Sequence, residues 1–135
     1  MGKYTDILDD IFSVFDAAGW QAESIPTYPQ NHIPVNPGSE WLRISIVPSS
    51  FLSTLDSISG QLIIDIFTSA GNGPKRPFEI ADILDQYLTG QYLETSGNGA
   101  TQFLNSTMGQ GTLDEDNPSL YRSIYTISFN YTGVQ

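Results

Sequence analysis

Few residues of this chain have types and spacing that could carry out chemistry. The 135 residues include one histidine, His32, and no cysteine, so neither a thiolate metal site nor a disulfide can form. His32 lies in a proline-rich segment, and no serine, aspartate or cysteine stands at a spacing that assigns it as a catalytic partner. We interpret His32 as a surface residue, and we expect no catalytic residue, no cofactor-binding residue and no metal ligand.

The segment Ala70–Pro77 (AGNGPKRP) superficially resembles a phosphate loop, because Gly and Lys follow a predicted strand and precede a predicted helix. It lacks the Gly-Lys-Ser/Thr ending, and Pro74 and Pro77 remove backbone amides that would face a phosphate. A structural loop is therefore favoured. Lys75 and Arg76 are two of only five cations, and their adjacent placement predicts a contact with an acidic partner.

Acidic residues gather at one predicted tip and also occur inside one strand. The tip consists of Asp114, Glu115 and Asp116. It lacks the spaced acids, central glycine and distal glutamate of a calcium loop, so a solvated loop is favoured. Asp65 sits in the middle of a strand, where it could pair with Arg43 or Arg122 across the sheet. We favour a structural ion pair there over a role in acid–base chemistry.

The charge balance excludes one class of partner. Five Lys and Arg residues stand against 15 Asp and Glu residues, which gives a net charge of −10. Too few positive charges are present to neutralise many phosphates, so we do not expect the chain to wrap nucleic acid.

No apolar run approaches the ~18 residues of a membrane span. The N-terminus (MGKYTDILDD) has acids where a signal peptide needs its apolar core.

Hydrophobic periodicity predicts the elements that must position these residues. Apolar residues recur at three- and four-residue spacing in two segments, which predicts helices over 5–18 and from Pro74 or Pro77 to Gly90. Alternation of apolar and polar residues predicts strands over 41–47, 61–68, 101–112 and 120–131. The last of these strands carries an aromatic stripe of Tyr121, Tyr125, Phe129 and Tyr131. Sheet packing is the favoured interpretation of the stripe, and a subunit interface is the alternative.

The order α-β-β-α-β-β favours an α+β fold with two layers. We expect both helices to pack on one face of a four-stranded mixed, mostly antiparallel sheet. No internal repeat and no domain boundary interrupts residues 1–135, so we expect one domain. Residues 24–39 hold four prolines and predict an extended loop or a poorly paired edge, with a short edge strand at Ile33 and Val35.

The connection Pro48–Gly60 is long for a hairpin, so it is either a structured loop or an extended hairpin arm. It is too apolar for a solvated linker because it contains Phe51, Leu52, Leu55 and Ile58. We expect Ser49–Ser59 to be mobile in the free protein and to become ordered against a neighbouring subunit. The alternative is that the four apolar side chains pack on the domain's own sheet.

Several of these features occur in an order that resembles a known family. A helix and a proline-rich segment precede two strands, a Gly-rich turn, a second helix and a long aromatic strand. The residues that carry the resemblance are Trp41-Leu42-Arg43-Ile44, Gly60 to Phe67, Ala70-Gly71-Asn72-Gly73, Ile80 to Ile83, Tyr121-Arg122 and Phe129-Asn130-Tyr131. The pattern covers nearly the whole chain. It resembles the tail-terminator (tail-completion or minor tail) proteins of long-tailed bacteriophages and related phage domains of unknown function.

The resemblance implies a non-enzymatic virion protein that needs no cofactor. Such proteins form a ring, expected to be a hexamer, which caps the tail tube, stops its polymerisation and offers a docking face to the head connector. The implied partners are further copies of the chain, the tail tube protein and the head–tail connector, while DNA only passes through the channel. The implied location is the neck end of the phage tail, after assembly in the host cytoplasm.

Within such a ring, the expected subunit or tube interface consists of Phe51, Leu52, Leu55, Ile58, Lys75 and Arg76. The expected acidic loop facing the channel or a partner consists of Asp114, Glu115 and Asp116. Two other non-enzymatic classes stay open: another neck or tail-tube component of the same particle, and a small acidic binding protein such as an immunity-type inhibitor. An enzyme is the least favoured class, because the chain offers so few catalytic residues.

Overall fold

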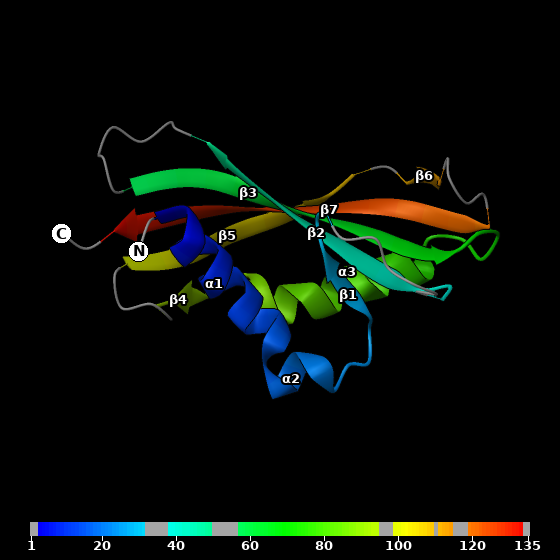
Figure 1. Cartoon of the computed structure of the whole chain (residues 1–135). Helices are drawn as coiled ribbons and strands as arrows, with labels where there is room; N and C mark the ends of the chain where they lie inside the picture. Colours follow the sequence, from blue (N-terminus) through cyan, green and yellow to red (C-terminus); the bar gives the residue numbers. More distant parts are fainter. Residues whose placement is uncertain are drawn as a thin grey trace.

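The computed structural model describes residues 3–31, 38–49, 57–94, 99–109, 111–114 and 119–133. Three helices lie in these ranges: α1 (Lys3–Asp16), α2 (Ala18–Gln21) and α3 (Lys75–Leu88). The strands are β1 (Thr27–Pro29), β2 (Trp41–Ser49), β3 (Ser57–Ser69), β4 (Tyr92–Leu93), β5 (Gly99–Met108), β6 (Thr112–Leu113) and β7 (Leu120–Gly133). Figure 1 shows the helices on one side of a long, twisted sheet.

All seven strands belong to one mixed sheet. Its order is β1-β2-β3-β7-β5-β4, and β6 pairs with β7 off this path. β1 runs parallel to β2, whereas the other pairs are antiparallel. The central pair is β3 and β7, with 13 and 14 residues, and every residue of β3 has a partner in β7. This long antiparallel pair forms the centre of the sheet, and its side chains alternate between the two faces.

The main core lies between the sheet and the helices. Amphipathic spacing gives α1 and α3 one apolar stripe each, and each stripe packs on alternate residues of the strands. The helices contribute Ile7, Ile11, Phe15, Trp20, Ile80, Leu84 and Leu88. The strands contribute Leu42, Ile44, Leu62, Ile64, Ile66, Phe103, Tyr125, Ile127, Phe129 and Tyr131. The three helices therefore all bury their apolar residues against the same face of the sheet.

The expected four-stranded sheet with two helices is wrong, because the described residues form seven strands and a third, short helix. The missing strands β1, β4 and β6 contain 3, 2 and 2 residues, too few to produce a recognisable alternation. The four longer strands and the two long helices are found where periodicity predicts them, within a few residues. The edge strand expected at Ile33 and Val35 lies outside the described residues, and the edge strand that is described is β1.

The outer edge of β2 is closed to further strand pairing over much of its length. β1 covers the beginning of this edge, and the amide of Gln30 donates to the carbonyl of Ile44 at 2.7 Å. Beyond β1, the side chain of Gln30 accepts the amide of Ile46 at 2.6 Å. The next outward position is Pro48, which has no amide hydrogen to donate. These features block edge-to-edge association at this side of the sheet.

The strands β2 and β3 continue into the Pro48–Gly60 connection as an extended hairpin arm. Pro48 pairs with Gly60 and Ser49 with Ser59, which confirms one of the two expected alternatives for the described residues. Gly60 is required by a close approach of backbones, because a Cβ atom there would lie 2.5 Å from the carbonyl oxygen of Val47. The same Cβ would lie 2.9 Å from the ring of Phe129.

Candidate assembly surfaces

The predicted docking arm contributes one described residue, Ile58, and that residue is buried. Ile58 is 2% exposed, pairs in register with Tyr131 and belongs to the main core. For Ile58 the docking prediction is therefore wrong, because the side chain packs on the domain's own sheet. The remaining residues predicted for this arm, Phe51, Leu52 and Leu55, lie outside the described residues.

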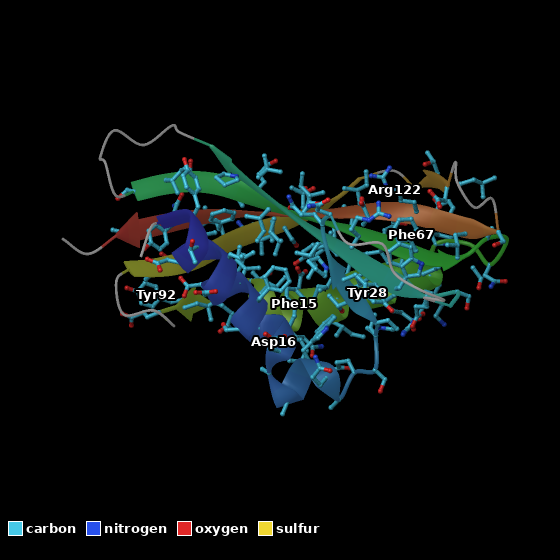
Figure 2. All side chains as sticks on the ribbon, viewed as in Figure 1. Phe15, Asp16, Tyr28, Phe67, Tyr92 and Arg122 are labelled. Atoms are coloured by element: carbon cyan, nitrogen blue, oxygen red, sulfur yellow. The ribbon has the colours of Figure 1, made fainter. Side chains whose placement is uncertain are left out.

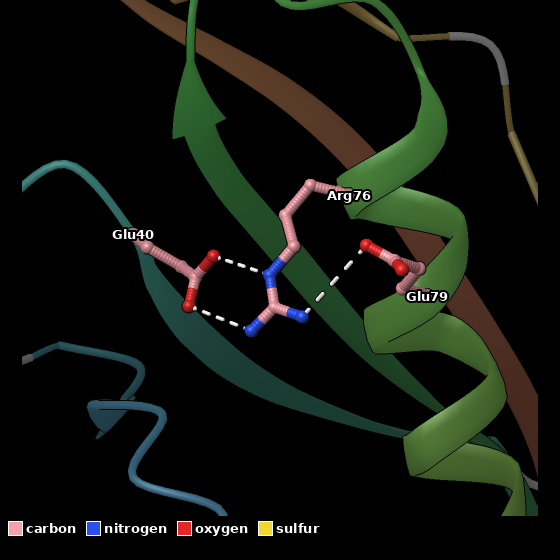
Figure 3. A network of polar contacts seen from close by, with 3 residues as sticks. All are labelled: Glu40, Arg76 and Glu79. Carbon is pink, nitrogen blue, oxygen red and sulfur yellow. Dashed lines mark hydrogen bonds and ion pairs between the residues drawn. The ribbon is translucent and has the colours of Figure 1, made fainter.

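Lys75 and Arg76 form the start of α3 rather than part of a loop, and Arg76 already has a partner within the chain. Its Nε and Nη2 atoms donate to the two carboxylate oxygens of Glu40 at 2.6 and 3.0 Å, and Glu79 lies 3.9 Å away (Figure 3). The hydrogen bond from Arg76 lowers the pKa of Glu40 despite the partial burial of that carboxyl group. Of this pair, the exposed Lys75 therefore fits the predicted contact with an acidic partner better than Arg76 does.

The described part of the predicted acidic loop is Asp114, which follows β6. Its amide donates to the carbonyl of Leu120 at 3.0 Å, and its side chain is half-buried. Because β6 pairs with β7 at Tyr121 and Arg122, this loop begins at the Arg122 end of the sheet. Glu115 and Asp116 lie outside the described residues.

The aromatic stripe of β7 is mainly core, as favoured above. Tyr125, Phe129 and Tyr131 are buried beneath the helices, and Tyr121 is half-buried. The hydroxyl of Tyr131 donates to Asp6 of α1 at 2.9 Å. These tyrosines are therefore used to attach the helices to the sheet, which leaves little of the stripe for another subunit.

Carboxylates on the helices that accept hydrogen bonds from the sheet were not identified from the sequence. Asp85 of α3 accepts hydrogen bonds from the hydroxyls of Ser106 and Tyr125, both at 2.6 Å, and from Thr89 at 3.1 Å. Burial and the hydrogen bond to Asp85 raise the pKa of Tyr125. In α1, the buried Asp10 accepts from Thr101 at 2.8 Å. Asp10 lies within the apolar stripe of its helix. A charged residue at a position where burial is predicted is the signal from which a buried carboxylate could have been predicted.

The opposite face of the sheet carries no helix among the described residues, and we call it the uncovered face. Its centre is an ion-pair cluster in which Asp65 lies 2.9 Å from Nη2 of Arg122 and 3.8 Å from Nη1 of Arg43. Asp65 is 5% exposed. The expected pairing of Asp65 across the sheet is confirmed, and both arginines take part. Figure 2 shows Arg122 on the side of the sheet away from α1.

Aromatic side chains support this cluster. Trp41 and Phe67 stack with ring centroids 4.1 Å apart and planes 13° apart. The guanidinium of Arg43 lies over both rings, 5.3 Å from the Trp41 centroid and 5.2 Å from the Phe67 centroid. Tyr28 of β1 packs edge-on against Trp41 at 5.8 Å. Cation–π contacts of this kind fix the position of Arg43.

Small polar side chains make up much of the rest of the uncovered face. Alternation and register place there Ser45, Ser59, Gln61, Thr126, Ser128 and Asn130. Among the described strand residues on this face, Asp65 is the one acidic residue. Since two arginines face a single carboxylate, the uncovered face has a local excess of positive charge in a chain whose net charge is −10.

An open apolar groove lies between α1 and the β1–β2 edge. It has a volume of about 640 Å³. Its walls include Tyr4, Leu8 and Phe12 of α1 and Ile46 and Pro48 of β2. Tyr4 and Leu8 are 59% and 45% exposed. Apolar surface of this kind is a common feature of protein-binding sites.

Within the ranges described, no three His, Cys, Asp or Glu side chains converge on a point that could hold a metal ion. No helix in the same ranges is long and apolar enough to cross a membrane.

Comparisons with known proteins show with which solved structures this chain shares its fold. No protein family and no curated protein matches the sequence. One solved structure, whose name carries no functional description, has a TM-score of 0.71 and 16% identity over 95% of this chain and 97% of that chain. A chain from the virion of a native gene transfer agent particle has a TM-score of 0.66 and 13% identity, over 96% of this chain and 97% of that chain. This chain therefore shares, over nearly its whole length, the fold of a protein found in that virion.

Proposed function

We propose that this chain is a structural protein of a phage-like virion, in which copies of it form a ring that caps the tail tube. The observation that carries the proposal is the shared fold with a chain of the gene transfer agent virion, which extends over 96% of this chain and 97% of that one. The order of sequence features, which resembles tail-terminator proteins, supports the same conclusion on separate grounds.

In this role the chain acts through its surfaces rather than through catalysis. The ring stops polymerisation of the tube by covering the tube's last subunits, and its other side docks the head connector. DNA passes through the central channel without being held, in keeping with the net charge of −10. The site of action is the neck end of the tail. We propose six copies for the ring, as the resemblance to tail terminators implies.

A closed ring needs a heterologous contact, in which one patch meets a different patch on the next copy. The structure offers surfaces of unlike chemistry that suit this requirement. The apolar groove between α1 and β2 lies on the helical side of the molecule, whereas the Arg43–Asp65–Arg122 cluster lies on the uncovered face. The closed outer edge of β2 favours contacts through side chains over continuous strand pairing at that edge.

The test is deletion of the gene from the element that encodes it, followed by electron microscopy of the particles. The proposal predicts tails of abnormal length and heads without tails, and a plasmid copy of the wild-type gene restores normal particles. Particles of normal length and infectivity would contradict it. Tails of normal length that fail to join heads would favour another neck component over a tail cap.

A further inference from the structure

We propose that the uncovered face binds a carboxylate of a second copy of this chain in an arginine socket formed by Trp41, Arg43, Asp65 and Arg122. The inference rests on the proposed function, because a ring is built from copies of the chain. It assigns one of the two surfaces that meet in the contact between neighbouring copies. Three features of the molecule support it: the charge balance in the socket, the donors of its arginines and the distribution of acids over the rest of the chain.

The socket has more positive than negative charge. Arg43 and Arg122 both contact Asp65, whose side chain is 7% exposed, so the two guanidinium groups share one carboxylate. The side chains of Arg43 and Arg122 are 39% and 40% exposed. Each arginine therefore keeps donors that a second carboxylate can reach from solvent. Guanidinium groups bind carboxylates with two parallel hydrogen bonds, which favours a carboxylate as the ligand.

Two buried donors in the socket also lack an acceptor. Nε1 of Trp41 and Nε of Arg122 are buried, and neither has a hydrogen-bond partner in the structure. Trp41 is 5% exposed. A buried donor without an acceptor is destabilising, so such donors are rare in folded proteins. Both atoms are shielded from solvent, so the donors that an incoming carboxylate meets are those of the exposed parts of Arg43 and Arg122.

The socket is held in place before binding. Its residues come from the adjacent strands β2, β3 and β7, and the register sets Trp41 opposite Phe67 and Phe67 opposite Arg122. The stacked rings of Trp41 and Phe67 support the guanidinium of Arg43. Because strands and stacked rings leave few alternative rotamers, little conformational entropy is lost when a ligand binds.

A second copy of this chain fits the socket by charge. The chain has 15 acidic and 5 basic residues, and exposed acids lie on the helices: Asp9, Asp16, Glu79 and Asp82. The helices pack against the face of the sheet opposite the socket. A contact between the socket of one copy and an acidic surface of the next is therefore heterologous, as ring closure requires. Opposite charges on the two sides also favour this pairing over random association.

The test is sedimentation velocity of the full chain from micromolar to about millimolar concentration, at low and at high salt. The wild type is expected to self-associate, and its advantage over Arg43→Gln is expected to shrink at high salt, because screening weakens the contact between the socket and a carboxylate. Arg43→Gln is expected to weaken self-association about tenfold or more, since it removes one side of a charged contact. Lys75→Gln is the comparison variant, because it removes one positive charge from an exposed position outside the socket; an equal loss of self-association in this variant would assign the contact to the Lys75 surface that the sequence predicts.

A second variant tests whether a loss of self-association comes from loss of folding. Arg122→Lys keeps a positive charge beside Asp65 but removes the Nε donor and the planar fork, so it is expected to fold and to lose most self-association. Thermal unfolding is measured for each variant. In Arg43→Gln, Asp65 keeps its 2.9 Å contact with Arg122, so the fold is expected to persist.

Two outcomes would overturn the proposal: equal self-association of all four proteins, or a wild type that stays monomeric throughout. If a monomeric wild type were stabilised in thermal unfolding by added inorganic phosphate, the socket would be a site for a free anion instead. None of these results bears on whether gene deletion alters tail length, so the failure of this inference and the failure of the proposed function are distinguishable.

Discussion

The two faces of the sheet use the same strands in different ways. The face under the helices buries large apolar side chains, and its tyrosine hydroxyls donate to carboxylates on α1 and α3. The uncovered face carries small polar residues and an ion-pair cluster in which two arginines share Asp65. Because neighbouring residues along a strand point to opposite faces, a substitution can be placed in the core or on the uncovered face by moving one residue along the strand.

The largest effect is expected when an aromatic side chain is removed from the helix-covered face. Phe129→Ala removes a fully buried side chain and is expected to destabilise the fold by about 3–5 kcal/mol. The control is Ser128→Ala, the preceding residue on the uncovered face, with an expected change within about 0.5 kcal/mol. Urea unfolding followed by circular dichroism measures both. Similar losses in the two variants would remove the distinction between the faces.

The hairpin arm gives the next largest effect. Gly60→Ala places a methyl group 2.5 Å from the carbonyl oxygen of Val47, so backbones must shift, at a cost of about 1–3 kcal/mol. The matched control is Gly109→Ala, whose new methyl group meets Ile124 at an ordinary 3.6 Å. Thermal unfolding compares the two variants. If Gly60→Ala proved as stable as Gly109→Ala, the tight packing of β2 against β3 at this point would be contradicted.

High pH is expected to weaken the helix-covered face through Tyr125. Its pKa is raised in the folded state by burial and by Asp85, so above about pH 10 the unfolded chain releases a proton that the folded chain retains. Stability therefore falls as pH rises above 10, by up to about 1.4 kcal/mol per pH unit for this group.

Tyr125→Phe isolates that contribution. The variant is expected to lose stability less steeply than the wild type between pH 9 and 11 in urea titrations, although it is less stable at neutral pH because Asp85 loses one donor. Tyr92→Phe, at an exposed tyrosine, is expected to follow the wild-type slope. Identical slopes for all three proteins would show that Tyr125 is not held in its protonated form by the fold.

The smallest expected effect concerns the Glu40–Arg76 pair. The two side chains are 32% and 42% exposed, so solvent screening limits the pair to roughly 1 kcal/mol or less. The pKa of Glu40 is lowered, so its contribution is present at neutral pH and is lost as pH falls below its usual value of 4.5. A double-mutant cycle with Glu40→Gln and Arg76→Gln at pH 7 and pH 3 measures the coupling. Coupling that is larger at pH 3 would contradict this assignment.

Sequence alone could predict the faces of the long strands because a period of two residues is a local signal. It predicted that Asp65 could pair with Arg43 or Arg122 across the sheet, since a charged residue in an otherwise apolar strand needs a partner. It could not place Arg76 against Glu40, which is 36 residues away, because that contact depends on how α3 docks on the sheet. It could not place Ile58 in the core, because the register that buries this residue pairs β3 with β7, far along the chain.

The most direct test of the account is a cryo-electron microscopy reconstruction of tails assembled with this chain. The account predicts a ring of copies at the end of the tail tube, with Arg43 and Arg122 of each copy at the contact with the next. Absence of the chain from the tail, or a ring in which both arginines face open solvent, would contradict it.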